Sequence, residues 1–420
     1  MAEILKKYKW MGPIIAKMDR EIKMIFMKNF RYRNKDFFPK GEYKADIKNL
    51  ANCMNCPNMC RFECGTLQAA QKETMSPAYK ARIGYYLTTG KIDYNDPDFI
   101  NLMYMCSNEE SCKVWCPFEF SVVSLLETVR DDINDKGLMP DYCKKQIDKL
   151  KKTNTIEDHN IYVTYKDKSI ENVETDGKDE VFYYIGCESM KLPEVVKANI
   201  EILKKAGIKY STNLDTKVCC GAPAFSIRDL VLAKELAGKN IELIKSTGAK
   251  VVVSDCPGCI ETLTNRYANV GVKNSIKTIH IVEYISQLID EGKIKLENPV
   301  SEELKQIAIH DPCLLARNLG DTSSIRNILS KIPGIELQEP IYNKENTHCC
   351  GWSGTLHWAD EKVAKKEASN RINELRETGT DNIVTACPLC ELGLSHGIEE
   401  SEKEKIKVLD IAKLILSAIK

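Results

Sequence analysis

Two short stretches, VCCGAP (residues 218–223) and HCCGWS (residues 348–353), each place two adjacent cysteines before a glycine. Each lies within a set of five cysteines: Cys187, Cys219, Cys220, Cys256 and Cys259 in the first set, and Cys313, Cys349, Cys350, Cys387 and Cys390 in the second. The first cysteine precedes the pair by 31 or 35 intervening residues, and 34 or 35 separate the glycine from the final CPxC motif. The matched spacing indicates an internal duplication of about 130 residues.

The segments around these cysteines predict an α/β fold for both copies, at residues 179–300 and 301–420. Strand-like apolar runs, VVVSD (251–255) and NIVTA (382–386), precede the two CPxC motifs. A helical pattern ending in glycine lies between each CCG and its CPxC motif, at residues 226–248 and 358–379. Strand ends and loops should therefore bring each set of five cysteines to one edge of a sheet.

Five thiolates in one place predict a metal cofactor. They exceed the four ligands of a zinc site and the four of a cubane iron–sulfur cluster. A larger iron–sulfur assembly with a bridging cysteine would use all five. A strained vicinal disulfide, or zinc on four cysteines with one spare, remains an alternative.

The repeated motif resembles the CCG domain of heterodisulfide reductases, over roughly residues 45–420. The resemblance implies a noncubane 4Fe–4S cluster on each set of five cysteines, and cleavage of a mixed disulfide of coenzyme M and coenzyme B between the two clusters. The architecture is also similar to the iron–sulfur subunits of anaerobic glycerol-3-phosphate dehydrogenase and glycolate oxidase. In those proteins the CCG subunit passes electrons from a flavin partner toward quinone.

Seven further cysteines resemble a pair of bacterial ferredoxin motifs, and they predict a mainly helical ferredoxin-like domain at residues 46–135. Because each fourth cysteine of such a pair serves the other cluster, one cubane 4Fe–4S cluster is expected on Cys53, Cys56, Cys60 and Cys116. Cys64, Cys106 and Cys112 offer three thiolates to a second cluster.

Glu109 stands where the second motif lacks a cysteine, in CSNEESCKVWCP (residues 106–117). It could complete the second cluster as an oxygen ligand, or that site could lose an iron and hold a 3Fe–4S cluster. A solvated loop acid beside a vacant corner, or an abandoned second site, is the alternative.

Composition excludes some classes of protein. Lys+Arg and Asp+Glu are both 60, which argues against a nucleic-acid binder. No signal peptide or membrane-spanning run is predicted, so we expect a cytoplasmic location, with peripheral attachment at the inner membrane face as an alternative. A cytosolic chain with 18 cysteines is expected to bind metal rather than carry disulfides.

Two segments are expected to support the others. Residues 1–45 are basic, with Ile14, Ile15, Met18, Ile22, Ile25 and Phe26 at helical spacing. They predict a helix that packs on its own domain or docks on a partner or membrane. Residues 136–178 predict a helix, which contains Cys143, and a linker.

Residues beside the second CCG motif are candidates for substrate chemistry: His348, His310, Trp352 and Arg317. Disulfide cleavage makes two thiolates, so a proton donor and cations for anionic groups would help. Alternatively, His310 and His348 only hydrogen-bond cluster sulfurs or backbone. The first copy has Val218 and Ala222 at the positions of His348 and Trp352, which predicts that chemistry concentrates at the second site.

Three functions compete. The chain could reduce a small disulfide, pass electrons for a flavin-dependent glycerol-3-phosphate, glycolate or lactate dehydrogenase, or serve as an iron–sulfur scaffold. No flavin or nicotinamide fingerprint is present, so a redox partner subunit, a cytochrome b or a flavoprotein, is expected for either active function.

Overall fold

The computed structural model describes residue 13 and residues 16–24, 41–156, 180–214 and 218–420. The chain divides into two units, Met1–Tyr43 and Lys44–Lys420, which are considered separately. Ile14, Ile15, Ile25 and Phe26 of the predicted N-terminal helix lie outside the described residues, as does most of the predicted linker. Among the described residues, no helix is both long enough and apolar enough to cross a membrane.

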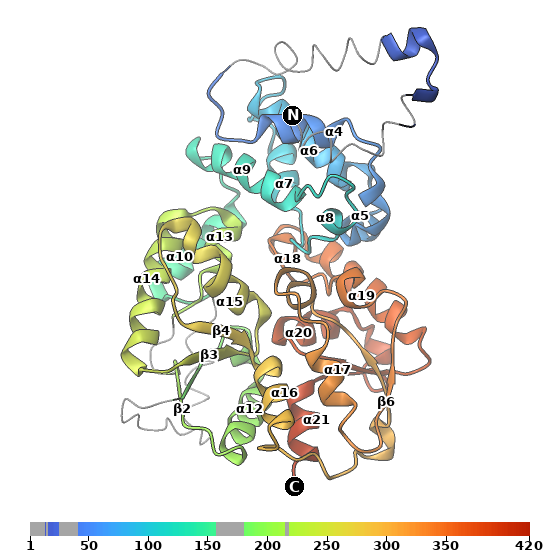
Figure 1. Ribbon diagram of the computed structural model, residues 1–420. Helices are drawn as coiled ribbons and strands as arrows, with labels where there is room; N and C mark the ends of the chain where they lie inside the picture. Colours follow the sequence, from blue (N-terminus) through green and yellow to red (C-terminus); the bar gives the residue numbers. More distant parts are fainter. Residues whose placement is uncertain (1–12, 14–15, 25–40, 157–179, 215–217) are drawn as a thin grey trace. The chain divides into compact units, whose positions relative to one another are not determined.

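Residues 44–156 are helical and contain no strand. Their helices are α4 (Ile47–Met54), η1 (Met59–Glu63), α5 (Gly65–Ala70), η2 (Glu73–Met75), α6 (Pro77–Thr88), α7 (Pro97–Tyr104), α8 (Ser111–Val114), α9 (Val122–Asp135) and α10 (Asp141–Thr153). Buried side chains from α4, α6, α7 and α9 form the packing of this part. Figure 1 shows these helices above the two halves of the duplicated part, with α10 lying beside α13 and α14.

The first copy contains a parallel sheet in the order β2-β1-β3-β4. Its elements are β1 (Val181–Tyr183), η3 (Ser189–Lys191), α12 (Pro193–Lys205), β2 (Tyr210–Thr212), α13 (Ala222–Ile227), α14 (Leu230–Thr247), β3 (Val251–Ser254), α15 (Pro257–Glu261), η4 (Thr262–Arg266), η5 (Tyr267–Val270), β4 (Lys277–His280) and α16 (Ile281–Asp290). The register pairs Val181 with Tyr210 on one side and with Val251 on the other. Helices cover both faces of this sheet, as the buried apolar strands require.

The second copy repeats this topology in the order β6-β5-β7-β8. Its elements are η6 (Glu302–Leu304), β5 (Gln306–Ile309), η7 (Leu314–Asn318), α17 (Ser324–Leu329), β6 (Glu336–Gln338), η8 (Lys344–Asn346), α18 (Leu356–Ala359), α19 (Glu361–Arg376), β7 (Asn382–Thr385), α20 (Pro388–Gly397), η9 (Glu400–Glu402), β8 (Lys407–Asp410) and α21 (Ile411–Ala418). The predicted strands before both CPxC motifs and the predicted helices before them are present, as β3, β7, α14 and α19.

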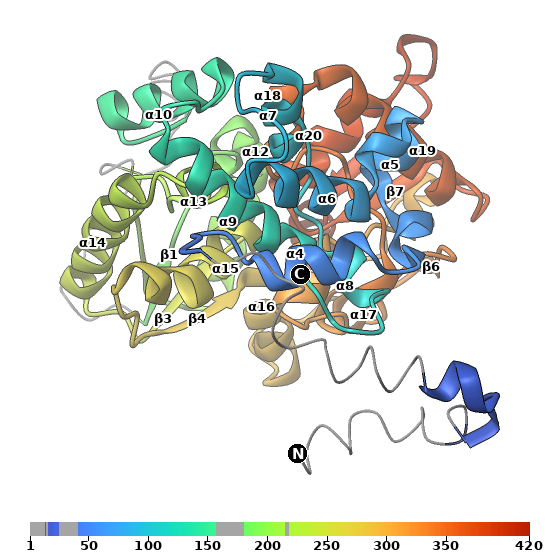
Figure 2. The same cartoon turned by 90° about the horizontal axis from the view of Figure 1, so that it is seen from above.

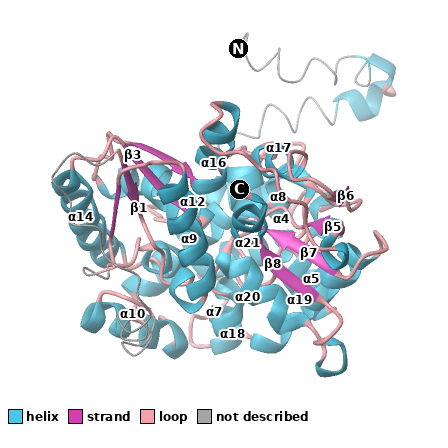
Figure 3. Ribbon diagram, turned by 90° about the horizontal axis from the view of Figure 1, so that it is seen from below, coloured by secondary structure: helices cyan, strands magenta, loops and turns pink. Residues whose placement is uncertain are grey.

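The two copies share a core. Helix α12 packs against α21, and α16 packs against α17. These two contacts are equivalent, because α12 and α17 follow the first strand of each copy while α16 and α21 follow the last. Apolar residues of both copies, such as Val196, Ile285, Ile328 and Ile415, belong to one continuous cluster. Figures 2 and 3 show the separate sheets with helices between them, so the duplication is packed as an internal pseudo-dimer.

Candidate metal centres

The topology explains why distant cysteines meet. In each sheet, the connection after the first strand runs to one side of the sheet and the connection after the third strand runs to the other side. A crevice therefore opens at the carboxyl ends of these two strands, which are β1 and β3 in the first copy and β5 and β7 in the second. Cys187 and Cys313 follow the first strands, and the CPxC motifs follow the third. The CCG loops follow β2 and β6, which are parallel to the first strands and so end on the same side as the crevice.

The first set forms a continuous series of neighbouring thiols. Cys187 interacts with Cys219, Cys219 with Cys220, Cys220 with Cys259, and Cys259 with Cys256. Hydrogen bonds from Cys219 and Cys259 hold the pKa of Cys220 well below its usual value. Cys220 thus lies in the middle of the series, between Cys219 and Cys259.

The second set repeats the series in the same order. Cys313 interacts with Cys349, Cys349 with Cys350, Cys350 with Cys390, and Cys390 with Cys387. Hydrogen bonds from Cys349 and Cys390 lower the pKa of Cys350 well below its usual value, whereas burial raises the pKa of Cys387 to about 11. All 18 cysteines of the chain are free thiols, so the structure does not show the alternative of a vicinal disulfide.

The glycine of each CCG motif has a backbone role. Gly221 and Gly351 have φ values of 92° and 75°, in the left-handed region that side chains disfavour. Their N–H groups donate to the sulfur two residues earlier, Cys219 at 3.4 Å and Cys349 at 3.3 Å. A side chain at position 351 would also lie 2.4 Å from the carbonyl oxygen of Ala364. Glycine thus lets the loop turn tightly around the thiols.

One cavity joins the two sets. It has a volume of about 340 Å³ and lies between the copies. Eight of the ten CCG cysteines line it: Cys187, Cys220, Cys256, Cys259, Cys313, Cys350, Cys387 and Cys390. Cys256 and Cys387 also interact electrostatically across the two copies. Two converging sets of soft sulfur donors fit an iron–sulfur cofactor, whose clusters are held by cysteine thiolates.

The charged side chains that line this cavity are mostly acidic. Glu110, Glu127, Glu188 and Glu261 line it, whereas Arg266 is the only Lys or Arg among the described residues that do so. Burial raises the pKa of Glu261 to about 7. Arg266 forms an ion pair with Glu127, so little positive charge remains for a ligand.

Of the four candidate residues for substrate chemistry, Trp352 lines the cavity. Its ring stacks on His396 at 4.5 Å and on His357 at 5.8 Å between ring centres. His357 also lines the cavity, and burial lowers its pKa to about 4, so its ring is neutral near pH 7. These rings form an aromatic wall beside the second set of cysteines.

His310 lies behind Cys350 and is fully buried. Arg371 donates to its Nδ1 at 3.2 Å, which leaves the hydrogen on Nε2. The imidazole interacts with the Cys350 thiol, and Nε2 has no other partner among the described residues. This geometry agrees with the alternative in which His310 hydrogen-bonds a sulfur ligand.

His348 and Arg317 do not line the cavity and instead face residues 44–156. His348 Nδ1 lies 2.7 Å from Glu374, and its Nε2 lies 3.0 Å from Glu63. Arg317 donates to the carbonyl oxygens of Glu109 at 2.5 Å and Glu345 at 2.8 Å. Sequence adjacency to the CCG loop could not reveal these partners, since neighbouring loop residues point in opposite directions.

The structure brings together the four cysteines that are expected to hold the first ferredoxin-type cluster. Cys53 interacts with Cys56, Cys60 and Cys116, although Cys116 lies in the second sequence group. Burial raises the pKa of Cys60 to about 12. The arrangement agrees with the crossed spacing expected from ferredoxin motifs.

The other three ferredoxin-type cysteines, Cys64, Cys106 and Cys112, line a small separate cavity together with Glu109. Glu109 is only 5% exposed, so the alternative of a solvated loop acid is wrong. Its carboxylate accepts from Ser111 Oγ at 2.8 Å and lies 3.6 Å from Arg317 Nη1. It can therefore serve as an oxygen donor in the protein interior.

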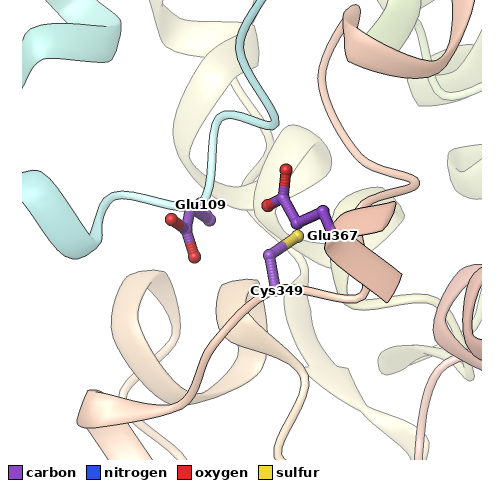
Figure 4. A group of neighbouring side chains, drawn as sticks. All are labelled: Glu109, Cys349 and Glu367. Carbon is purple, nitrogen blue, oxygen red and sulfur yellow. The ribbon is translucent and has the colours of Figure 1, made fainter. Parts of the chain in front are cut away.

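Glu109 also belongs to a second group, with Cys349 and Glu367. One donor atom from each lies within 4.8 Å of the others, and all three residues are buried. Figure 4 shows the three side chains converging, with the Cys349 sulfur next to the Glu367 side chain and the Glu109 carboxyl group opposite them. The sequence analysis did not identify Glu367. An alignment of the two copies on their CPxC motifs pairs Glu367 with the apolar residue Leu236, and this difference could have drawn attention to it.

Known proteins share these features. Residues 181–264 and 307–395 match the CCG family model, which describes a cysteine-rich domain. The chain is 29% identical over 331 residues to the D subunit of the dihydromethanophenazine:CoB–CoM heterodisulfide reductase of Methanosarcina barkeri, covering 77% of this chain and 79% of that protein.

Two further relatives have names that state other activities. The B subunit of the CoM/CoB fumarate reductase of Methanothermobacter marburgensis is 27% identical, with coverage of 90% of this chain and 74% of that protein. The EtfAB:quinone oxidoreductase of Syntrophomonas wolfei is 30% identical, over 58% of this chain and 35% of that protein. The similarity thus extends over several kinds of oxidoreductase.

Proposed function

Because this chain belongs to the family of iron–sulfur oxidoreductases with CCG domains, we propose that it reduces a small disulfide at the cavity between its two CCG copies. The class proposed is that of the CoM–CoB heterodisulfide. The bond between the two substrate sulfurs breaks, two electrons arrive from a redox partner subunit, and two protons end on the product thiols.

The observation that carries this proposal is the shared cavity. Eight cysteines from both copies converge on about 340 Å³, so a disulfide placed there could be approached from two sides. One noncubane 4Fe–4S cluster on each set of five cysteines would supply single electrons at this point. A metal site with only three or four cysteine ligands would not account for the matched series of five thiols in both copies.

The ferredoxin-like segment would supply the entry route. We assign one 4Fe–4S cluster to Cys53, Cys56, Cys60 and Cys116, and a second 4Fe–4S or 3Fe–4S cluster to Cys64, Cys106 and Cys112 with Glu109 beside them. Gly354 and Thr355 of the second copy contact the backbone of Cys106. The second CCG site therefore adjoins the second ferredoxin-type site.

The protein's other residues have distinct proposed roles. Trp352 would contact the substrate, and His310 would hydrogen-bond the sulfur of Cys350. His348 and Arg317 would act as positioning residues, because their contacts fasten the CCG loop to the ferredoxin-like segment.

A second function is favoured by the acidic cavity lining. Four glutamates and a paired arginine give poor compensation for a substrate with several negative charges. An electron-transfer subunit of a flavin-dependent glycerol-3-phosphate, glycolate or lactate dehydrogenase, delivering electrons to quinone, needs no anionic substrate there. In either function we propose a cytoplasmic location, with a cytochrome b or flavoprotein partner that could hold the chain at the membrane.

The two functions separate in one experiment. Anaerobically purified protein should contain about 12 to 16 irons per chain. Reduced viologen should then be oxidised by a small disulfide. Cys350→Ser should abolish this turnover and remove iron, because a serine oxygen is a hard donor and ionises far less readily than a thiol.

Cys143→Ser is the matched control. Cys143 is buried in α10, is free, and belongs to neither cysteine set. It should keep full iron and turnover. Full iron without turnover of any disulfide would support the electron-transfer function, whereas zinc as the main metal would refute both.

A further inference from the structure

The group of Glu109, Cys349 and Glu367 joins parts of the chain that are distant in sequence. Glu109 comes from the ferredoxin-like segment, Cys349 from the CCG loop and Glu367 from α19 (Figure 4). Donors bound to one ion at about 2.0–2.3 Å lie no more than roughly 4.6 Å apart. Their observed separations of at most 4.8 Å need little adjustment to meet that limit.

Both carboxylates are incompletely satisfied. Glu367 is 2% exposed, accepts from Thr66 Oγ1 at 3.2 Å, and has no hydrogen-bond partner at Oε1 among the described residues. Glu109 Oε2 is also buried and has no hydrogen-bond partner among the described residues, although it lies 3.6 Å from Arg317 Nη1. Arg317 lies near Glu109, but no cationic side chain of the described residues forms an ion pair with Glu367. A buried carboxylate without compensation is costly, so a bound cation would explain this arrangement.

The first copy provides an internal comparison. The space next to the CCG glycine is occupied by Leu236 in the first copy and by Glu367 in the second. An added Cβ would meet Leu236 Cβ at 3.7 Å from position 221, and Glu367 Cβ at 3.1 Å from position 351. The equivalent place is therefore apolar beside Cys219 and carries a carboxylate beside Cys349.

Glu367 is also held in place closely. A Cβ at Gly65 would lie 2.7 Å from Glu367 Oε1, so only glycine leaves room for the carboxylate there. Gly351 borders it on the other side. The packing fixes the side chain toward Cys349 instead of allowing it to reach solvent.

We propose that Glu367, together with Glu109, supplies oxygen ligands to the iron that Cys349 binds. This inference rests on the proposed function only in that it requires iron at the second CCG site. The second site is then a mixed oxygen and sulfur site, whereas the first has only sulfur donors. Oxygen donors are harder than thiolates and favour the more oxidised iron, so the two sites would differ in redox behaviour.

Mössbauer spectroscopy of the anaerobic, ⁵⁷Fe-enriched full chain tests this assignment. Wild-type protein should show a component of iron with oxygen ligands beside the sulfur-ligated components. Glu367→Leu, which introduces the residue type of the first copy, should strongly weaken or shift that component, because Glu109 alone then supplies oxygen, and the near-isosteric Glu367→Gln should change it in the same direction.

Glu374→Gln is the matched control. Glu374 lies on the same helix, two turns later, but it is paired with His348 and Arg371 and lies outside the donor group. This variant should keep the oxygen-ligated component. In every sample the paramagnetic signals of the ferredoxin-type clusters report whether the chain is folded.

The outcomes are distinct. Identical wild-type and Glu367 variant spectra, or the same change in Glu374→Gln, would overturn the inference. Iron at both CCG sites with only sulfur-type spectra would overturn it and leave the proposed function standing. Absence of iron from both CCG sites would overturn the two together.

Discussion

Gly354 lies where the backbone of the second CCG copy closely approaches the backbone of the ferredoxin-like segment. Its φ is +66°, and an added Cβ would lie 2.3 Å from the carbonyl oxygen of Cys106 and 2.8 Å from the carbonyl carbon of Ser107. Both are backbone atoms that no rotamer change can remove. Gly354→Ala must therefore move one backbone segment by about 1 Å, since ordinary contact begins at 3.4 Å.

The expected cost has two parts. An alanine in the left-handed region costs about 1–2 kcal/mol. Overpacking against rigid neighbours adds about 1–3 kcal/mol. The displacement also threatens the hydrogen bond from the Thr355 N–H to the Cys106 carbonyl oxygen, at 3.2 Å. We therefore expect the free energy required to open the contact between the two segments to be roughly 2–5 kcal/mol lower in Gly354→Ala than in the wild type.

Gly320→Ala is a matched control, because Gly320 has a φ of +74° and no atom within 4 Å of the place where a Cβ would lie. Hydrogen exchange followed by mass spectrometry should show faster exchange around residues 104–108 and 353–356 in Gly354→Ala only. Electron transfer from the ferredoxin-type clusters to the second CCG site should also slow in that variant. Equal exchange in the two variants would refute the reasoning, because the contact would then be able to relax without opening.

Three further predictions follow from particular parts of the chain. Glu109→Cys should raise the iron content or convert a 3Fe to a 4Fe signal in paramagnetic resonance, because position 109 lines the same cavity as Cys64, Cys106 and Cys112. If the iron content and the signal are unchanged, Glu109 is not a ligand of the ferredoxin-type cluster and could act only at the Cys349 site. Removing residues 1–40 should keep the iron content and viologen-driven turnover but weaken binding to the partner subunit in a pull-down, and loss of clusters would contradict this. Burial lowers the pKa of His280 to about 4, although Asp321 opposes the shift. As the pH falls, His280 is therefore protonated in the unfolded chain before it is protonated in the folded one. The free energy of unfolding should decrease by up to about 3 kcal/mol between pH 6.5 and 4. His280→Asn should show a smaller decrease in urea unfolding at these pH values, and parallel curves would contradict the assignment.

The sequence was sufficient for the duplicated fold because its signals are local and repeated. Short apolar runs predicted the strands that precede Cys256 and Cys387, and helical periodicity predicted the helices that precede those strands. Both patterns depend only on residues that are close together in the sequence. The convergence of the ten CCG cysteines also followed, since parallel strands end at one edge of a sheet. The crossed pairing of Cys116 with the first ferredoxin-type group was expected from the resemblance to paired bacterial ferredoxin motifs.

Contacts across the fold could not be predicted in this way. His348 was placed with the substrate because it precedes Cys349, yet its partner Glu63 lies 285 residues away. Arg317 follows Cys313 closely but donates to the backbone of Glu109. Such partners depend on how whole segments pack, for which a single sequence contains no periodic signal.

These contacts explain why the second copy differs from the first. His348 with Glu63, Arg317 with Glu109, and Glu367 with Thr66 all cross between the second copy and the ferredoxin-like segment.

The first copy has Val218 and Leu236 where the second has His348 and Glu367, and neither side chain could form such polar contacts. Its own contact with the segment uses Arg130, which donates to the Ser226 carbonyl oxygen at 2.8 Å. The polar residues near the second site therefore need not all serve a substrate, because several of them join that site to the segment from which electrons would arrive. The contact at Gly354, where an added Cβ would lie 2.3 Å from the Cys106 carbonyl oxygen, is where this junction can be disturbed.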